Sequence, residues 1–167
     1  MPDICDLVLD DHATFRRRFG DLDEHRDADG DQLAKLWKPL GDLLELHAAV
    51  EERIFYPCLL ETGTQAKEET EDAIKDHNEI RDAVALAGEQ AAGSSDWWSA
   101  VDAAREQNSD HMAEEERGAI ADLRKNAAPE LRDELGVRWL SFREEHAALR
   151  GIEVEDKDPG SYLKHPG

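Results

Sequence analysis

The sequence has no long apolar run, few basic residues, few aromatic residues and only two cysteines. A membrane-spanning helix needs about 20 consecutive apolar residues, and no segment approaches this length, so no membrane association is expected. Residues 1–6 contain neither a basic nor an apolar stretch, which argues against a secretory signal and predicts a cytoplasmic protein. Cys5 and Cys58 do not form a disulfide framework and are expected to be buried thiols.

The charge is strongly one-sided, with 20 Lys and Arg against 40 Asp and Glu, a formal net charge of −20. Nucleic acid and anionic membrane surfaces are therefore unsuitable partners. A basic protein partner would suit this charge, but no motif indicates one. The chain of 167 residues is long enough for one core and too short for two, so residues 1–167 are predicted to form a single domain.

Apolar residues recur at helical spacing in four long segments, and no segment shows the alternation of a strand. Pro39 either kinks the second helix or marks its first turn, Pro57 closes or bends it, and Ser95 is the predicted N-cap of the fourth. The prediction is an all-α, up-down-up-down four-helix bundle with an additional C-terminal helix and a tail. The bundle is expected over about residues 3–126, with its first helix over about 3–25, the fifth helix over about 129–150 and the tail over 151–167.

Each of the four long helices carries one histidine on its apolar stripe: His12, His47, His77 and His111. Two of them have a glutamate one turn further on, Glu51 after His47 and Glu115 after His111. Residues at i and i+4 share a helix face, so each pair can present a nitrogen and an oxygen to one interior point.

A single histidine on an apolar face is more often a hydrogen-bonded core residue than a ligand. Four such histidines with two glutamates would be costly to bury, however, and metal binding removes this cost for all six. The set exceeds the four ligands of one zinc and is too rich in nitrogen for calcium or magnesium. It suits two bridged first-row ions and favours iron. The ferritin-like class instead uses Glu-x-x-His at i and i+3.

The combined pattern of His12, His47-x-x-x-Glu51, His77 and His111-x-x-x-Glu115 resembles the hemerythrin-like (HHE) family of non-haem di-iron bundles, over about residues 3–126. The resemblance implies two iron ions per chain beneath an oxo or hydroxo bridge. It makes the four histidines terminal ligands, and Glu51 and Glu115 bridging carboxylates.

The sequence departs from the oxygen-carrying members of that family, which have a fifth histidine in the third helix. One turn before His77 stands Ala73, and one turn after it stands Arg81. One iron is therefore expected to have an open position or a replacement ligand. Tyr56 is a weak candidate because it lies nine residues after His47, half a turn out of phase. The candidates for a replacement ligand are Tyr56, His146, Tyr162 and His165.

Three glutamates beside the predicted ligands, Glu52, Glu114 and Glu116, fall off the apolar stripes and are interpreted as a solvated face. The tryptophans are expected in the core or at its edge.

The first functional hypothesis is a di-iron oxidoreductase that consumes peroxide or nitric oxide, with a catalase- or peroxidase-like role in oxidative or nitrosative stress. Its ligands would be hydrogen peroxide, nitric oxide or dioxygen. The alternative is a non-enzymatic oxygen or iron sensor or store. A metal-free interaction bundle is the third possibility. Catalytic turnover, as against one equivalent reacted per centre, discriminates the first two.

Overall fold

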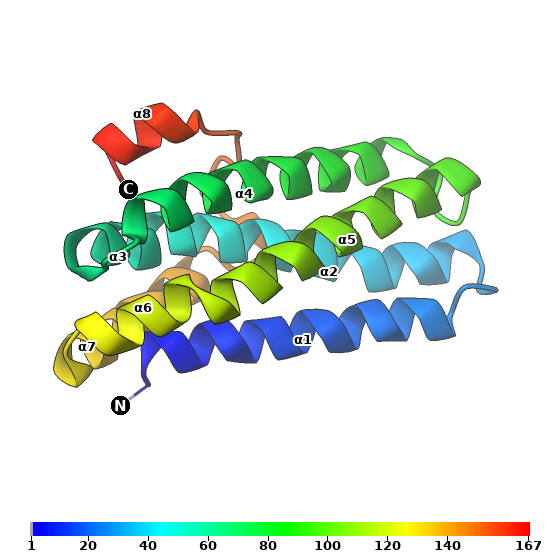
Figure 1. Cartoon of the computed structure of the whole chain (residues 1–167). Coiled ribbons are helices and arrows are strands. Elements are labelled where there is room, and N and C mark those ends of the chain that lie inside the picture. The colour runs from blue at the N-terminus through cyan, green and yellow to red at the C-terminus, as the bar shows by residue number, and fades with distance from the viewer. Residues whose placement is uncertain (1) are drawn as a thin grey trace.

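The computed structural model describes residues 2–167, and every regular element in this range is helical. Four long helices run alternately up and down (Figure 1). The predicted all-α bundle with an additional C-terminal helix is thereby confirmed. No helix within the described residues is both long enough and apolar enough to span a bilayer. The elements are α1 (Ile4–Glu24), α2 (Gly30–Val50), the π-helical η1 (Glu51–Phe55), α3 (Tyr56–Thr62), α4 (Ala66–Glu89), α5 (Ser95–Arg117), α6 (Ala119–Asn126), α7 (Pro129–Glu145), the 3-10 turn η2 (Ala147–Leu149) and α8 (Pro159–Lys164).

Short polar side chains begin three of the long helices. Asp3 accepts a hydrogen bond from the backbone N–H of Cys5 at the start of α1, and Asp29 starts α2 in the same way. The N-cap of α5 is Ser94, whose hydroxyl accepts from the Trp97 N–H at 3.1 Å. The prediction of Ser95 at this position was wrong by one residue, because either serine fits the cap pattern.

The two prolines of the second helical segment act differently. Pro39 lies inside α2, which begins at Gly30, so it does not mark the first turn. Pro57 lies in the first turn of α3, where a missing N–H costs nothing. Between α2 and α3 the chain makes the π turn η1, so the helical path continues past Val50 with its register changed.

The fourth helix reaches residue 126 as predicted, but it is broken at Gly118 into α5 and α6. Helix α4 passes close to this break, since a Cβ on Gly118 would lie 2.9 Å from Glu69 Oε1. Helix α7 ends at Glu145, and the 3-10 turn η2 follows it, so the fifth segment is also less regular than one helix.

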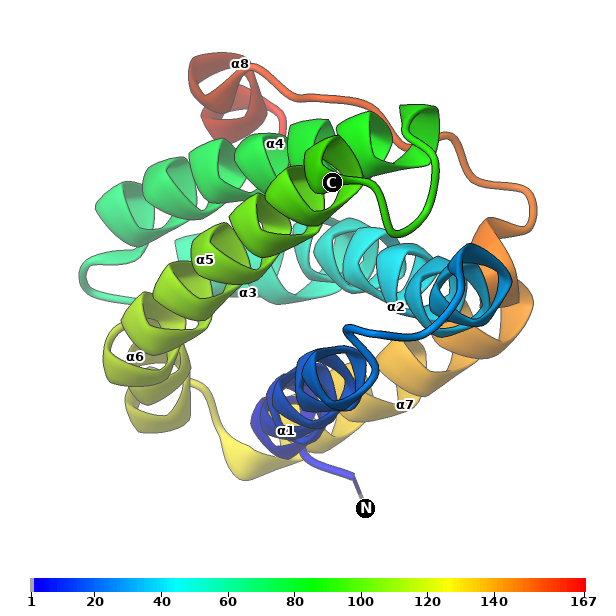
Figure 2. The ribbon, with the colours of Figure 1, turned by 90° about the vertical axis from the view of Figure 1, so that its right-hand side faces the viewer.

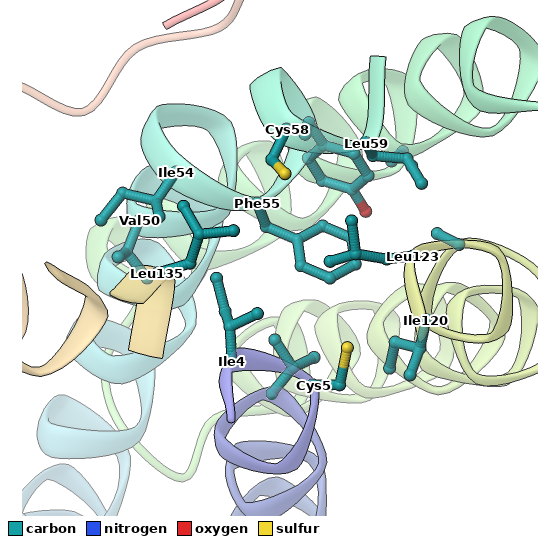
Figure 3. Packing of buried hydrophobic residues seen from close by; sticks show 14 of the residues in the cluster. Ile4, Cys5, Val50, Ile54, Phe55, Cys58, Leu59, Ile120, Leu123 and Leu135 are labelled. Carbon is teal, nitrogen blue, oxygen red and sulfur yellow. The ribbon is translucent and has the colours of Figure 1, made fainter. Parts of the chain in front are cut away.

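Two clusters of buried hydrophobic residues occupy the two ends of the bundle. One contains Ile4 and Val8 of α1 with residues of α2, η1, α3, α4, α6 and α7, and much of it is drawn in Figure 3. The other contains Phe15 and Phe19 of α1, with Trp37 of α2 and residues of α4 and α5. His12 of α1 lies between Val8 of the first cluster and Phe15 of the second. Buried polar residues at this level of the bundle form a layer between the two clusters.

Helix α7 packs against α1 and α2 and covers the outside of this layer (Figure 2). The Trp139 ring is fully buried, with its centroid 5.6 Å from that of His47. Gly136 allows the N-terminal segment of the chain to pass close to α7, since a Cβ on this residue would lie 1.8 Å from the Pro2 carbonyl oxygen. On another side, α8 packs against the outer face of α4. Trp37, Trp97 and Trp139 are buried and Trp98 is partly buried, as expected.

Candidate metal centre

The polar layer consists of the six residues that the sequence singled out. Each is at most 4% exposed, and each comes from the apolar stripe of its helix. Their ligand atoms fall into two groups whose members lie within 4.8 Å of one another. Glu51 belongs to both groups. The first group is His12, His47, Glu51 and Glu115, and the second is Glu51, His77 and His111.

Glu51 lies between the histidines of three helices. Its Oε1 is 2.9 Å from His47 Nε2. Its Oε2 is 3.2 Å from His77 Nε2 and 3.9 Å from His111 Nε2. A carboxylate with one oxygen facing each group has the position of a bridge between two cations.

Glu115 faces both groups with a single oxygen. Its Oε2 is 3.2 Å from His12 Nε2 and 3.8 Å from His111 Nε2. Its other oxygen, Oε1, accepts a hydrogen bond from the Tyr56 hydroxyl at 2.8 Å. The two glutamates are therefore not equivalent, although their sequence patterns are the same.

Every histidine of the layer contacts a carboxylate of a neighbouring helical segment on the side of its ring that faces away from the layer. In each pair the imidazole Nδ1 faces the carboxylate oxygen, and this fixes the direction in which Nε2 points. The pairs are His12 with Glu116 at 2.9 Å, His47 with Asp11 at 3.0 Å, His77 with Glu52 at 2.9 Å and His111 with Asp76 at 3.3 Å.

With Nδ1 as the donor, each neutral imidazole directs the Nε2 lone pair into the layer. His77 Nε2 and His111 Nε2 lie 3.2 Å apart, a contact that is unfavourable between two lone pairs. Such a set of converging acceptors fits a cation that accepts their lone pairs. Five of the inward-facing atoms have no hydrogen-bond partner among the described residues: His12 Nε2, His47 Nε2, Glu51 Oε1, Glu51 Oε2 and Glu115 Oε2.

Without a cation, protons have to neutralise the carboxylates. Burial lowers the pKa of His47, but Glu51 and Asp11 outweigh it and raise the pKa to about 10. The same balance, with Asp76 and Glu51 opposing burial, raises the pKa of His111 well above its ordinary value. Burial raises the pKa of Glu51, yet the facing imidazoles hold it well below the ordinary value. Cation binding would therefore displace protons.

Tyr56 reaches the layer because of the π turn. In a regular helix, nine steps of about 100° place Tyr56 about 180° away from His47. A π turn accommodates one extra residue, so Tyr56 lies about 80° away, on the side of Glu51 at about 40°. Tyr56 is fully buried, and burial together with Glu115 raises the pKa of its phenol well above the ordinary value.

Of the other three candidates for an additional ligand, the two histidines do not join either group of ligand atoms. His146 directs Nδ1 to the Arg150 carbonyl oxygen, and His165 is exposed. The Tyr162 hydroxyl donates to the Glu52 carbonyl oxygen behind the layer.

The interpretation of Glu52 as part of a solvated face was wrong, whereas Glu116 is partly exposed, with its side chain 30% exposed, and also contacts His12. Glu52 is 1% exposed and accepts from Arg81 Nη2 at 2.6 Å, in addition to its contact with His77. Burial raises the pKa of Glu52, but His77, Arg81 and Lys157 lower it to about 2. Both glutamates are one position beyond a predicted ligand and turn towards the next helix. Glu114 is exposed, as expected.

Basic side chains balance three of the four supporting carboxylates. Arg16 donates to Glu116 at 2.7 Å and Arg143 donates to Asp11 at 2.5 Å. Arg81 and Lys157 both donate to Glu52. Asp76, in contrast, has no lysine or arginine within 4.0 Å among the described residues.

A pocket of about 220 Å³ opens beside Asp76 and leads from the surface to the layer, and we call it the α4–α5 pocket. Ala73, one turn before His77, lies on its wall. The lining residues are Tyr56, Gln65, Glu68, Glu69, Asp72, Ala73, Asp76, His111, Glu114, Glu115 and Ala119.

Comparison with known proteins agrees with this geometry. The family described as "Hemerythrin HHE cation binding domain" matches residues 3–123 of the chain. This range covers more than half of the chain and includes all six residues of the layer. Searches of curated proteins and of solved structures gave no match.

Proposed function

Because the chain belongs to the hemerythrin HHE cation-binding domain family, we propose that its cation is a pair of iron ions and that the loaded protein reacts with small oxidants. The cation-binding character follows from the family and from the two clusters of buried ligand atoms. We propose His12, His47, Glu51, His77, His111 and Glu115 as the ligands, with Glu51 shared between the two ions. Nitrogen-rich sites of this kind favour iron.

One observation carries the proposal that the loaded protein is an enzyme: the α4–α5 pocket reaches His111 and Glu115 directly. Ala73 leaves open the space from which a fifth histidine would approach the second group. A volume of about 220 Å³ admits hydrogen peroxide, nitric oxide or dioxygen. The favoured reaction is the catalase-like conversion of two hydrogen peroxide molecules to two water molecules and one dioxygen.

The bound iron pair would supply the reversible electron transfer for this reaction. The chain holds the ligands in place through the four carboxylates behind the imidazoles. Glu51 keeps the two groups at a fixed separation. Tyr56 stays protonated, because its pKa is raised well above the ordinary value, and its hydroxyl lies on the wall of the pocket. The phenol donates its one proton to Glu115 Oε1, and its oxygen can accept a hydrogen bond from hydrogen peroxide without being negatively charged.

The test is the iron-to-protein ratio of the purified protein together with its near-ultraviolet absorption, followed by turnover assays with hydrogen peroxide and nitric oxide. We expect two irons per chain, oxo-to-iron charge-transfer bands and many turnovers with one of the two oxidants. Glu51→Ala should lose iron and turnover together. Full iron content in Glu51→Ala would contradict the bridging role, and little iron in the native chain after reconstitution would leave a metal-free bundle.

A sensor is the second candidate, and the contacts of the tail favour it. Lys157 Nζ and the Tyr162 hydroxyl both donate to Glu52, the residue that supports His77. Metal binding at His77 could therefore change how firmly the tail is held. A loaded protein that reduces at most one equivalent of oxidant per centre, and whose tail becomes protease-sensitive when iron is removed, would be a sensor.

A further inference from the structure

The walls of the α4–α5 pocket are far more acidic than the rest of the chain. Acidic residues make up 40 of the 167 residues of the sequence but 6 of the 11 that line this pocket. No lysine or arginine lines it. The general acidity of the protein therefore does not account for the concentration of carboxylates at this one place.

Three of these carboxylates form a row along α4 that leads inwards. Glu68, Asp72 and Asp76 are spaced four residues apart, so they lie on one face of the helix and rise about 12 Å. Glu68 and Asp72 are exposed, whereas Asp76 is half-buried, with Oδ2 3.3 Å from His111 Nδ1. Glu68 lies in the first turn of α4, where the helix dipole favours an acid, and Asp72 accepts a hydrogen bond from Lys75 Nζ at 3.2 Å. Asp76 has neither kind of compensation, although like charges at this spacing repel one another.

The inner end of the pocket is the buried carboxylate of Glu115 on α5. Glu115 is 4% exposed, and its Oε2 accepts no hydrogen bond within residues 2–167, although His12 Nε2 lies 3.2 Å from it. A ligand that passes the three carboxylates thus arrives at an unsatisfied anionic oxygen. The ligand that suits both the row and its end is a divalent cation.

The other sides of the centre lack this excess of negative charge. Arg16, Arg143, and Arg81 with Lys157 form ion pairs with the carboxylates that support three of the histidines. Because those pairs are close to neutral, a cation is attracted most strongly on the side of Asp76. Clefts lined by one sign of charge concentrate ions of the opposite sign and increase their rate of binding.

We propose that the α4–α5 pocket is the route by which divalent metal ions enter the centre, with Glu68 and Asp72 as transient binding groups at its mouth. This inference rests on the proposed metal centre. The pocket would then serve two purposes, because the uncharged oxidants would follow the same path once the metal is bound. The acidic mouth would also slow the entry of small anions.

The test measures how fast the full-length, metal-free chain takes up Co²⁺, whose visible absorption reports ligation and which does not need dioxygen to be excluded. The variant Glu68→Gln/Asp72→Asn removes two charges, and neither residue contacts a histidine of the layer. We expect its uptake rate constant to fall about tenfold at low salt, with the final stoichiometry and spectrum unchanged. At about 1 M salt, where the screening length is about 3 Å, the difference should disappear.

The matched control is Glu130→Gln/Glu134→Gln, which removes the same charge from two exposed residues spaced four apart on α7. The route is refuted if the pocket variant loads as fast as the native chain at low salt, or if the control slows uptake equally. In those cases native loading and turnover would leave the proposed function intact. If the native chain itself takes up no Co²⁺ and no Fe²⁺, the proposed function fails and the route fails with it.

Discussion

Removal of the metal should give the protein a pH dependence of stability that the loaded form lacks. In the metal-free chain the pKa of His47 is about 10, because Glu51 and Asp11 outweigh the effect of burial. In the unfolded chain the same histidine has a pKa near its ordinary value of 6.5. A folded pKa above the unfolded one means that the stabilisation is fully present below pH 6.5 and is lost as the pH rises towards 10.

The size of this change in the free energy of unfolding follows from the release of one proton. Between pH 7 and 9 the unfolded state has released the proton and the folded state still holds it, so unfolding becomes easier by about 1.4 kcal/mol per pH unit. For a domain of this size that is a fall in Tm of about 3–6 °C per unit, or about 6–11 °C across the window. His111, whose pKa is also raised, acts in the same direction. Burial raises the pKa of Glu45 to about 7, so this carboxyl is half-titrated at the lower limit and adds to the fall in stability only between about pH 7 and 8.

The assay is thermal unfolding by circular dichroism at pH 7, 8 and 9, with and without metal. The loaded protein should show a nearly constant Tm in this window, because metal-bound imidazoles are already unprotonated. A metal-free protein whose Tm is constant or rises from pH 7 to 9 would refute the reasoning. The metal-free Glu51→Gln variant is the control, since it lacks a carboxylate that raises the pKa of His47, and its slope should be smaller.

Three further predictions concern single side chains. Glu52→Gln should weaken metal affinity about 10- to 100-fold while the fold persists, measured by competition with a chelator. Tyr56→Phe leaves Glu115 Oε1 without its donor, which should destabilise the metal-free protein by about 1–3 kcal/mol in denaturant unfolding and alter the absorption of the loaded centre. Gly136→Ala should destabilise by about 1–3 kcal/mol through collision with the N-terminal backbone, whereas Gly20→Ala, where nothing lies within 4 Å of the added Cβ, should be neutral or stabilising. An equal response of the two glycine variants would contradict the packing described for α7.

The sequence predicted the bundle and the burial of the six residues of the layer, because both depend on one regular property; their role as metal ligands stays a prediction. Apolar side chains and histidines recur with the period of a helix, and four such stripes have to face one another to be buried. That period fixes which side of a helix a residue occupies. It therefore placed His77 and Glu51 in the interior without any knowledge of how the helices cross.

The same reasoning misplaced Tyr56 and Glu52, and it missed the contact of Glu116 with His12. The π turn rotates Tyr56 about the helix axis by about 100°, the angle of one residue. The amino acids at positions 51–55 do not predict such a turn. Glu52 and Glu116 do lie off the stripe of their own helices, as the period requires, but each contacts a histidine of a different helix. Their function depends on the distance between helices, which a single sequence does not contain. The one local signal is that each directly follows a predicted ligand.

The hydrogen bonds behind the four histidines form a closed cycle with one direction. An acid of α1 contacts the histidine of α2, an acid of η1 contacts that of α4, an acid of α4 contacts that of α5, and an acid of α5 contacts that of α1. The four long helices follow one another around the bundle in this order (Figure 2). Each long helical segment is thus fixed in rotation by two neighbours at once. If the chain were cut between α3 and α4, each half would keep one complete pair and one histidine whose acid belongs to the other half. Neither fragment could complete the ring alone, and the two would have to recognise each other to restore it.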